Sequence, residues 1–334
     1  LDNPTARLIE KTRSWNIDKS IIYVCPIESS EPSTQWPPMY TISVVNQKGG
    51  VGKTTTTIAC ATALHHRDIR VLVIDLDSSM NTTAWCLGRH LEANEASIYD
   101  SLVAQKRGAQ GEADWPLTNL IEESQLGFDY VPANRDLSAA DAELANEPFL
   151  LADRLQELDD TLRSGPAPAS PDMSSDGPYD FCLIDCPPSL GTLVYVALIA
   201  SSGLIIPLGA DQFSLDGLSQ LLTTFRKARR VNPDLEILGL LLNNLDHRYG
   251  LTSDLVEELE AAYGDRVFET KVPARARIRE APMGVDILDH ASGSDVVEIY
   301  NGVVDELLER TGHADPARTP EDADTRTRPQ STAV

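Results

Sequence analysis

Lysine is scarce in this sequence, so the position of each lysine is informative. The 334 residues contain seven lysines and 21 arginines against 51 acidic residues, and the formal net charge is −23. Such an excess of negative charge excludes general attraction to nucleic acid, so any contact with DNA phosphates has to be local. The charge fits an ordinary acidic protein, and equally a salty cytoplasm in which salt screens the repulsion between surface charges.

Paired cysteines are absent. The five cysteines are scattered and no C-x-x-C spacing occurs among them, which excludes a disulfide framework and the usual zinc and iron–sulfur patterns. The first residues show no signal-peptide pattern, and we expect a reducing cytoplasm. These cysteines are Cys25, Cys60, Cys86, Cys182 and Cys186.

A membrane-spanning helix is not expected. The uncharged run Leu190–Ala210 has 21 residues, which is long enough to cross a bilayer. Ser201, Ser202, Gly203 and Pro207 interrupt it, however, and these residues are typical of turns. We interpret the run as a buried helix, a turn and a buried strand.

Apolar strands alternate with helical segments from Tyr40 onward. YTISVVN and VLVIDLD are short apolar runs, and the helix predicted between them covers Thr54–His66. Strands of this kind, separated by helices, predict an α/β fold: a single doubly wound, mostly parallel sheet with helices on both faces. Further strands are predicted at Phe128–Pro132, Phe181–Asp185, Leu204–Pro207 and Ile237–Asn243.

Composition divides the chain into a central domain and two flanking segments. Residues 1–39 form an N-terminal extension, with a possible short helix at Thr5–Trp15, and end in a linker. Residues 40–312 form the α/β domain, in which the Pro/Ser/Gly-rich stretch 164–178 is expected to be a flexible insertion. Residues 313–334 are polar and acidic, and we expect this tail to be disordered.

The segment NQKGGVGKTTTT, Asn46–Thr57, lies between the first predicted strand and the helix after it. Glycines allow backbone N–H groups to surround phosphate oxygens, and a helix N-terminus adds positive potential. In such a loop Lys53 reaches the β- and γ-phosphates, and the hydroxyl of Thr54 binds Mg²⁺. We therefore predict a nucleotide site whose backbone cradle is Gly49, Gly50, Val51 and Gly52.

Acidic residues follow two of the predicted strands. Asp185 ends FCLID, where a carboxylate can hold the Mg²⁺ shell, and Asp75 and Asp77 end VLVIDLD. Open α/β sheets bind ligands at the carboxyl ends of their strands, so we expect Asp75 and Asp185 at the metal with Thr54. Taken alone, each acid could instead cap the helix that follows it.

These motifs resemble the deviant Walker A ATPases of the ParA/MinD group within the P-loop NTPases, and ParA/Soj-type partition ATPases most of all. The resemblance covers about residues 40–310 and rests on QKGGVGKTTTT, VLVIDLD, DFCLIDCPPSLG and FETKVPARARIREAP. It implies that Lys48 reaches across a homodimer to the partner's ATP, which would make ATP binding the trigger for dimerisation. Lys48 could otherwise be a solvated surface lysine.

The same resemblance assigns further roles. It implies that Asp77 orients or activates the attacking water, that Thr55 helps to hold phosphate or metal, and that Asn243 and Pro273 lie at the adenine. One departure concerns the loop after the second strand, where the family usually has Asp-Pro-Gln-Gly-Asn and this chain has Asp77-Ser78-Ser79-Met80-Asn81.

The chain ends favour one branch of the group. The tail has no apolar face, unlike the membrane-binding helix of MinD-like members, and the cysteines do not suit an iron–sulfur carrier. The resemblance then implies an ATP-dependent partition or positioning ATPase. Such a protein hydrolyses ATP weakly with Mg²⁺, binds nucleoid DNA without sequence preference, and is stimulated by a ParB-like or adaptor partner while it segregates plasmid, chromosome or protein cargo.

Two clusters of basic residues could contact DNA. FRKARRVNP carries Arg226, Lys227, Arg229 and Arg230, and VPARARIRE carries three arginines at alternate positions. Solvated charges that offset an acidic surface are the alternative in both cases. Two other functions stay open, namely a nucleotide-binding scaffold with little hydrolysis and a metabolic P-loop enzyme. The predicted DNA-binding residues are Arg248, Arg275, Arg277 and Arg279.

Overall fold

The apolar strands assemble into one seven-stranded sheet in the order β3-β4-β2-β5-β1-β6-β7. All neighbouring strands are parallel except the short β3, which pairs antiparallel with β4 at one edge. The predicted doubly wound, mostly parallel sheet is therefore confirmed. The strands are β1 (Tyr40–Val44), β2 (Val71–Asp75), β3 (Glu122–Glu123), β4 (Asp129–Val131), β5 (Phe181–Asp185), β6 (Gly203–Gly209) and β7 (Glu236–Asn243).

The computed structural model describes residues 38–92, 95–103, 115–164, 177–209, 215–245, 250–274, 283–292 and 294–313. The possible helix at Thr5–Trp15 lies outside these residues. So do nearly all of the N-terminal extension, most of the insertion at 164–178, and the tail beyond His313. The domain boundaries drawn from composition therefore stay predictions.

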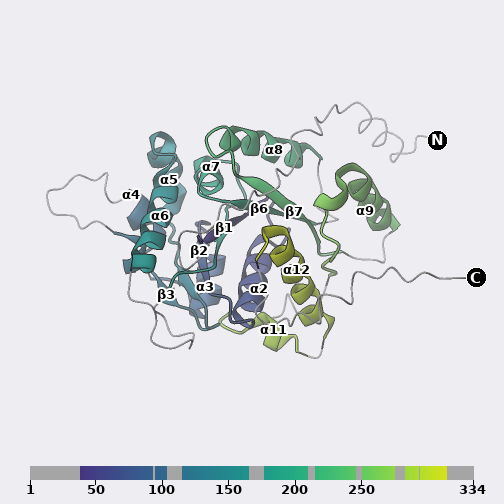
Figure 1. Ribbon diagram of the computed structural model, residues 1–334, viewed down its shortest axis with the longest axis horizontal. Helices are drawn as coiled ribbons and strands as arrows, with labels where there is room; N and C mark the ends of the chain where they lie inside the picture. The colour runs from purple at the N-terminus through teal and green to yellow at the C-terminus, as the bar shows by residue number, and fades with distance from the viewer. Residues whose placement is uncertain are drawn as a thin grey trace, which may run out of the picture. The chain divides into compact units, whose positions relative to one another are not determined.

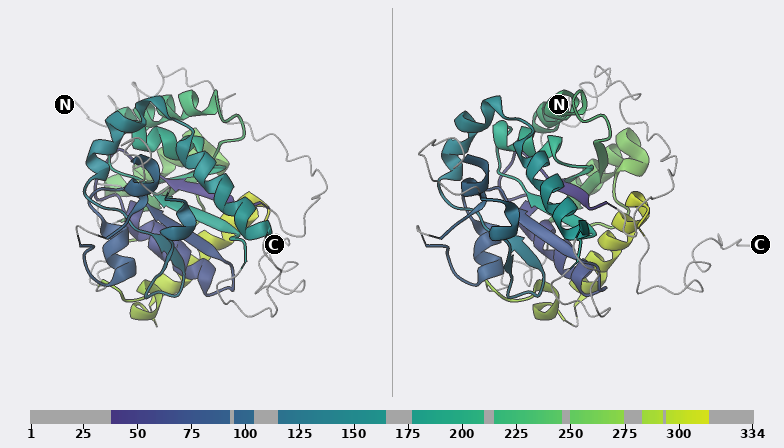
Figure 2. Two further views of the ribbon diagram at one scale, coloured as in Figure 1. Left: turned by 90° about the vertical axis from the view of Figure 1, so that its left-hand side faces the viewer. Right: turned by 60° about the vertical axis from the view of Figure 1, so that its left-hand side comes forward.

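Helices cover both faces of the sheet, as Figures 1 and 2 show. One buried cluster contains residues of α2, α11 and α12, and the other contains residues of α4 to α8. The sheet separates two hydrophobic cores, which explains why its central strands are apolar along their whole length. The helices are α2 (Lys53–His65), α3 (Asn81–Leu87), α4 (Ile98–Val103), α5 (Leu137–Glu143), α6 (Leu150–Ser164), α7 (Thr192–Ile199), α8 (Leu215–Arg229), α9 (Gly250–Tyr263), α11 (Ile287–His290) and α12 (Asp295–Thr311), with 3₁₀ turns η3 (Leu117–Asn119), η4 (Leu144–Asn146) and η5 (Gly264–Arg266).

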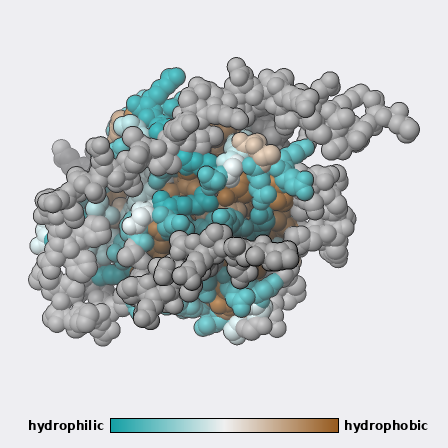
Figure 3. Space-filling model, turned by 45° about the vertical axis from the view of Figure 1, so that its right-hand side comes forward, coloured by the Kyte–Doolittle hydropathy of each residue, from teal (hydrophilic) through white to brown (hydrophobic). Residues whose placement is uncertain are grey.

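The uncharged run at 190–210 forms α7, a turn and β6, as predicted. Every residue of β6 is buried, and the hydroxyl of Ser201 in the turn lies 2.7 Å from that of Ser43 on β1. Among the described residues, no helix has both the length and the apolar composition to cross a bilayer. The face shown in Figure 3 presents hydrophilic residues around a central group of apolar ones.

The strand after the phosphate loop is shorter than predicted. The expected strand reached Asp77, but β2 ends at Asp75. The backbone N–H of Asp77 donates to the Asp75 carboxylate at 2.9 Å, which turns the chain out of the sheet. The side chain of Asp75 thus stabilises the turn that follows the strand.

Candidate functional site

The glycine-rich loop connects β1 to α2 at the carboxyl edge of the sheet, beside β5 and β6. Gly50 and Gly52 adopt left-handed φ values of 75° and 92°, which L-residues with a side chain rarely adopt. A Cβ at Gly52 would lie 2.1 Å from Nδ2 of Asn243, so there is also no space for a side chain there. Gly49 is exposed and a Cβ there would meet nothing within 4 Å.

The two lysines of the loop occupy opposite environments. Lys53 is buried, and its ammonium donates to the carbonyl oxygen of Lys48 at 3.1 Å. Burial lowers the pKa of Lys53, while the nearby carboxylates of Asp185 and Asp77 act in the other direction. Lys48 is exposed, and its ammonium makes no hydrogen bond or ion pair with any residue that the structure describes.

The structure places Thr54 and Asp185 in contact. Thr54 Oγ1 donates to Oδ2 of Asp185 at 2.6 Å, and Thr82 Oγ1 donates to the same oxygen at 2.7 Å. The other oxygen, Oδ1, is buried and has no hydrogen-bond partner in the described part of the chain. A buried carboxylate oxygen without a donor calls for a cation or ordered water, and a hydroxyl next to a carboxylate suits a hard cation such as Mg²⁺. Thr54 and Asp185 therefore fit the predicted metal.

Asp75 lies beside Asp185, because the two residues pair in register across β2 and β5. Burial, followed by the charge of Asp185, raises the pKa of Asp75 to about 8. Burial also raises the pKa of Asp185 to about 6, against the lowering effect of the Thr54 and Thr82 hydroxyls. Two acids packed without solvent in adjacent strands cannot both ionise easily, and a bound cation would favour their charged forms.

Both oxygens of Asp75 already have donors. Oδ1 accepts from the backbone of Asp77, and Oδ2 accepts from the N–H and the hydroxyl of Thr83 at 2.8 Å each. Thr83 lies in the first turn of α3, so Asp75 satisfies an N–H at the start of the next helix, as the capping alternative suggested. Its role as a metal ligand stays a prediction.

The loop that carries Asp77 keeps a tight shape despite its unusual sequence. Asp77 is half-buried, and its Oδ1 accepts from the N–H of Ser79 at 2.9 Å. Met80, at the position of the family's glycine, adopts a left-handed φ of 56° with its side chain buried. A left-handed residue with a side chain costs about 1–2 kcal/mol, which burial of the methionine offsets.

Asn243 and Pro273 lie in segments that neighbour each other at the end of β7. Nδ2 of Asn243 donates to the carbonyl of Val51 at 3.1 Å and lies 3.4 Å from Thr56 Oγ1. Pro273 is buried and forms an isolated bridge with Leu245, just after β7. Asn243 thus holds the phosphate loop, a contact that the sequence did not reveal, and the adenine contacts of both residues stay predictions.

The remaining predicted residues divide by location. Thr55 is half-buried in the first turn of α2, and Val51 is buried in the loop. In the basic cluster FRKARRVNP, Arg226, Lys227 and Arg230 are exposed at or just beyond the end of α8. The four predicted DNA-binding arginines, Arg248, Arg275, Arg277 and Arg279, lie outside the described residues.

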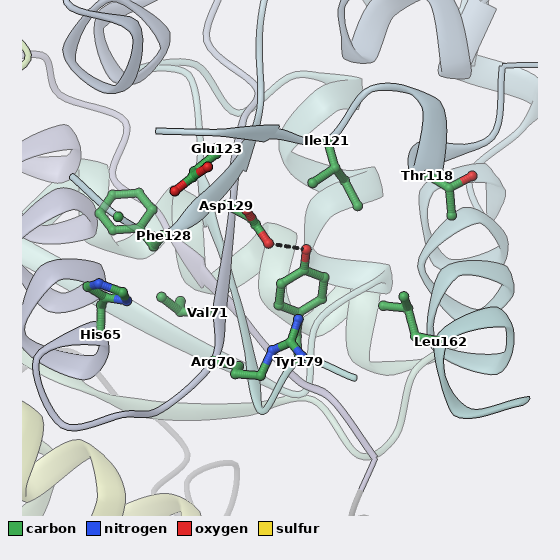
Figure 4. Close-up of a pocket in the computed structure, with 11 residues that line it drawn as sticks. His65, Arg70, Val71, Thr118, Ile121, Glu123, Phe128, Asp129, Leu162 and Tyr179 are labelled. Carbon is green, nitrogen blue, oxygen red and sulfur yellow. Dashed lines mark hydrogen bonds between the residues drawn. The ribbon is translucent and has the colours of Figure 1, made fainter. Parts of the chain in front are cut away.

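A cavity of about 620 Å³ opens at the amino-terminal ends of β2 and β4 (Figure 4). Val71 and Asp129, which begin β2 and β4, line it together with Tyr179, whose hydroxyl donates to Asp129 at 2.6 Å. Arg70 lies over the Tyr179 ring at 5.3 Å. Ligands of open parallel sheets bind at the carboxyl ends of the strands, so this cavity is separate from the predicted nucleotide site.

The described cysteines are free and buried. Cys182 lies inside β5 and Cys186 directly after it, and burial raises the pKa of each thiol above its ordinary range. A protonated, buried thiol is a poor metal ligand. These side chains therefore agree with the absence of an iron–sulfur pattern in the sequence.

Comparison with known proteins identifies close relatives of the chain. A family model described as an AAA domain matches residues 39–237. The chromosome partitioning protein ParA of Caulobacter vibrioides is 37% identical over 248 residues, which cover 73% of this chain and 84% of that protein. The chromosome-partitioning ATPase Soj of Thermus thermophilus is 36% identical over 275 residues, covering 82% and 97%.

Solved structures share the fold. The crystal structure of cobyrinic acid a,c-diamide synthase from Mycobacterium smegmatis with bound ADP and magnesium is similar with a TM-score of 0.63 and 27% identity. The match covers 84% of this chain and all of that one. That relative, whose chain is matched along its full length, binds a nucleotide together with the predicted metal.

Proposed function

Since the chain belongs to the ParA/Soj family of partition ATPases, we propose that it is an ATP-driven switch that dimerises with ATP and positions DNA or a protein cargo. The observation that carries this proposal is the pair of lysines in one phosphate loop. Lys53 is buried and turned inward, whereas Lys48 is exposed and its ammonium has no partner among the described residues.

The exposed lysine supports dimerisation. A solvated ammonium gains little from its own chain, but it can neutralise phosphate charge when a second subunit faces it and water is excluded. Lys48 lies five residues before Lys53, directly before the first glycine of the loop. In this proposal each subunit contributes Lys48 to the triphosphate bound by its partner, so that ATP binding and pairing become one event.

The loop and the acidic residues beside it would bind and hydrolyse ATP within one subunit. The backbone of residues 49–52 and the ammonium of Lys53 hold the phosphates, and Thr54 with Asp185 would hold Mg²⁺. When bound, Mg²⁺ would withdraw charge from the phosphate oxygens. Asp77 orients the attacking water from a loop that its own carboxylate stabilises through Ser79. We expect weak hydrolysis in the absence of a stimulating partner.

DNA binding and a partner protein complete the proposed cycle. The exposed basic residues at the end of α8, and the arginines at 248, 275, 277 and 279, are candidates for sequence-independent contacts with phosphates. An activator of the ParB or adaptor type would bring a basic segment to this acidic protein, because complementary charge speeds association. The proposal places the protein on the nucleoid in the cytoplasm.

A metabolic P-loop enzyme is the second candidate. The cobyrinic acid a,c-diamide synthase of Mycobacterium smegmatis, which is 27% identical to this chain, favours this candidate. An amide-forming enzyme would have to accept a small substrate next to the γ-phosphate and release phosphate only when that substrate is present. A DNA-stimulated or partner-stimulated activity without any small substrate would favour the partition switch.

Sizing the protein with nucleotide tests the proposal. With ATP and Mg²⁺ the wild type should elute as a dimer, and Lys48→Ala should elute as a monomer while it retains affinity for a fluorescent ATP analogue. Lys53→Ala should lose the nucleotide affinity itself. Lys227→Ala, which removes an exposed lysine on α8, is the matched control and should dimerise normally. Undiminished ATP-dependent pairing of the Lys48 variant would refute the switch.

A further inference from the structure

One oxygen of Asp185 accepts two hydroxyl hydrogen bonds, and only one of the two donors belongs to the phosphate loop. Thr54 donates from α2 at 2.6 Å, and Thr82 donates from α3 at 2.7 Å. Thr82 has no exposed surface and Asp185 is 1% exposed, so the hydrogen bond between these two residues does not compete with bulk water, whereas Thr54 is half-buried. Hydrogen bonds to a carboxylate under these conditions are stronger than neutral ones.

Thr82 reaches Asp185 from the helix that follows the Asp77 loop. It is the second residue of α3, two residues after Met80, whose left-handed conformation ends the loop. Its neighbour Thr83 donates to Asp75 on the adjacent strand. Two consecutive threonines at the start of one helix therefore contact the two buried acids of the site.

The arrangement leaves the oxygens of Asp185 in different states. Oδ2 is saturated by two donors, whereas Oδ1 is buried without a partner among the described residues. A carboxylate held by Thr54 alone could rotate and exchange its oxygens. With a second donor from another element, one oxygen is fixed and the other is the one presented to the cation.

We propose that Thr82 is a positioning residue for the metal site. Its hydroxyl fixes the orientation of the Asp185 carboxylate so that Thr54 can bind Mg²⁺. Thr82 also connects the metal site to the loop that carries Asp77. This inference rests on the proposed nucleotide function, and it assigns Thr82 no contact with nucleotide or metal. It follows that Thr82 affects the affinity for Mg²⁺ and leaves the affinity for metal-free nucleotide intact.

The hydroxyl can be removed at nearly constant shape. Thr82→Val replaces it with a methyl group, and Thr82→Ser retains it. Outer-shell hydrogen-bond partners of metal ligands typically contribute 10- to 100-fold to metal affinity. We therefore expect Thr82→Val to raise, by about tenfold, the Mg²⁺ concentration at which a fluorescent ADP analogue is half-bound. In EDTA its affinity for the analogue should equal that of the wild type, and Thr82→Ser should restore the wild-type Mg²⁺ dependence.

Thr62→Val provides the matched control. Thr62 is a buried threonine on α2 whose hydroxyl has no hydrogen-bond partner in the described part of the chain. Its replacement tests the effect of a buried Thr→Val change away from the acids, and it should leave both affinities unchanged. If Thr82→Val does not fold, Thr82→Ala is compared with Thr82→Ser in the same titration.

The outcomes separate this inference from the proposed function. Mg²⁺ dependence that is the same for the wild type and the hydroxyl-free variant overturns the positioning role, and so does an equal loss of affinity with and without Mg²⁺. Failure of the wild type to bind the analogue under any condition would overturn the nucleotide site itself. The role of Thr82 is supported if Thr82→Val raises the Mg²⁺ concentration needed for half-binding without changing the affinity in EDTA, and if Thr82→Ser behaves like the wild type.

Discussion

Substitution of Gly52 by alanine tests the geometry of the phosphate loop without any ligand. Gly52 has a φ of 92°, and a Cβ would lie 2.1 Å from Nδ2 of Asn243. The left-handed backbone costs a residue with a side chain about 1–2 kcal/mol. Displacing Asn243 breaks its 3.1 Å hydrogen bond to Val51, and leaving those groups unpaired adds about 1–3 kcal/mol. The free energy of unfolding should therefore fall by about 2–5 kcal/mol.

Urea unfolding of the nucleotide-free protein measures this loss. Gly49→Ala is the control, because Gly49 does not have a positive φ and a Cβ there meets nothing within 4 Å. Its unfolding free energy should change by no more than about 0.5 kcal/mol. In an Asn243→Ala background the steric part disappears, and Gly52→Ala should then cost only the backbone share of about 1–2 kcal/mol. A loss below about 0.5 kcal/mol for Gly52→Ala in the wild type would refute the reasoning.

The other predictions concern Asp185 and Asp77. Because the folded pKa of Asp185 is raised to about 6, the unfolded chain ionises first as pH rises from about 4, and the wild type loses stability up to about pH 6. Asp185→Asn avoids this loss, so its advantage in urea unfolding without nucleotide should grow by roughly 3 kcal/mol between pH 4 and pH 7.5; a constant difference would contradict the raised pKa. Asp77→Asn keeps the acceptor for Ser79 but should slow phosphate release about 100-fold while the ATP dimer persists on a sizing column; wild-type release would remove Asp77 from the mechanism.

Much of the site follows from local sequence. Glycines at 50 and 52 are required by left-handed backbone, and Lys53 and Thr54 follow at the start of a helix that the pattern had predicted within one residue. The strand Phe181–Asp185 has the predicted bounds, because a continuous apolar run that ends in an acid is a local signal. These features depend on residues close together in the chain, where spacing alone fixes geometry.

The sequence pattern did not predict the contacts between distant segments of the chain. Asp75 and Asp185 both looked like metal ligands, yet Asp75 has both oxygens engaged by Asp77 and Thr83, and Asp185 keeps one oxygen without a donor in the described chain. Thr82 carried no sequence signal at all. Its role depends on α3 lying beside β5, more than 100 residues further along the chain.

The sequence by itself determined the fold class, the phosphate loop and the acidic residues that end two of the central strands. Each of these features is encoded in consecutive residues. The tertiary structure decided which carboxylate is available to a cation, which lysine is exposed, and that Asn243 donates a hydrogen bond to the phosphate loop. Those outcomes depend on strand register, on burial and on competition among hydrogen-bond donors from separate elements. Such competition is settled only when the elements pack together.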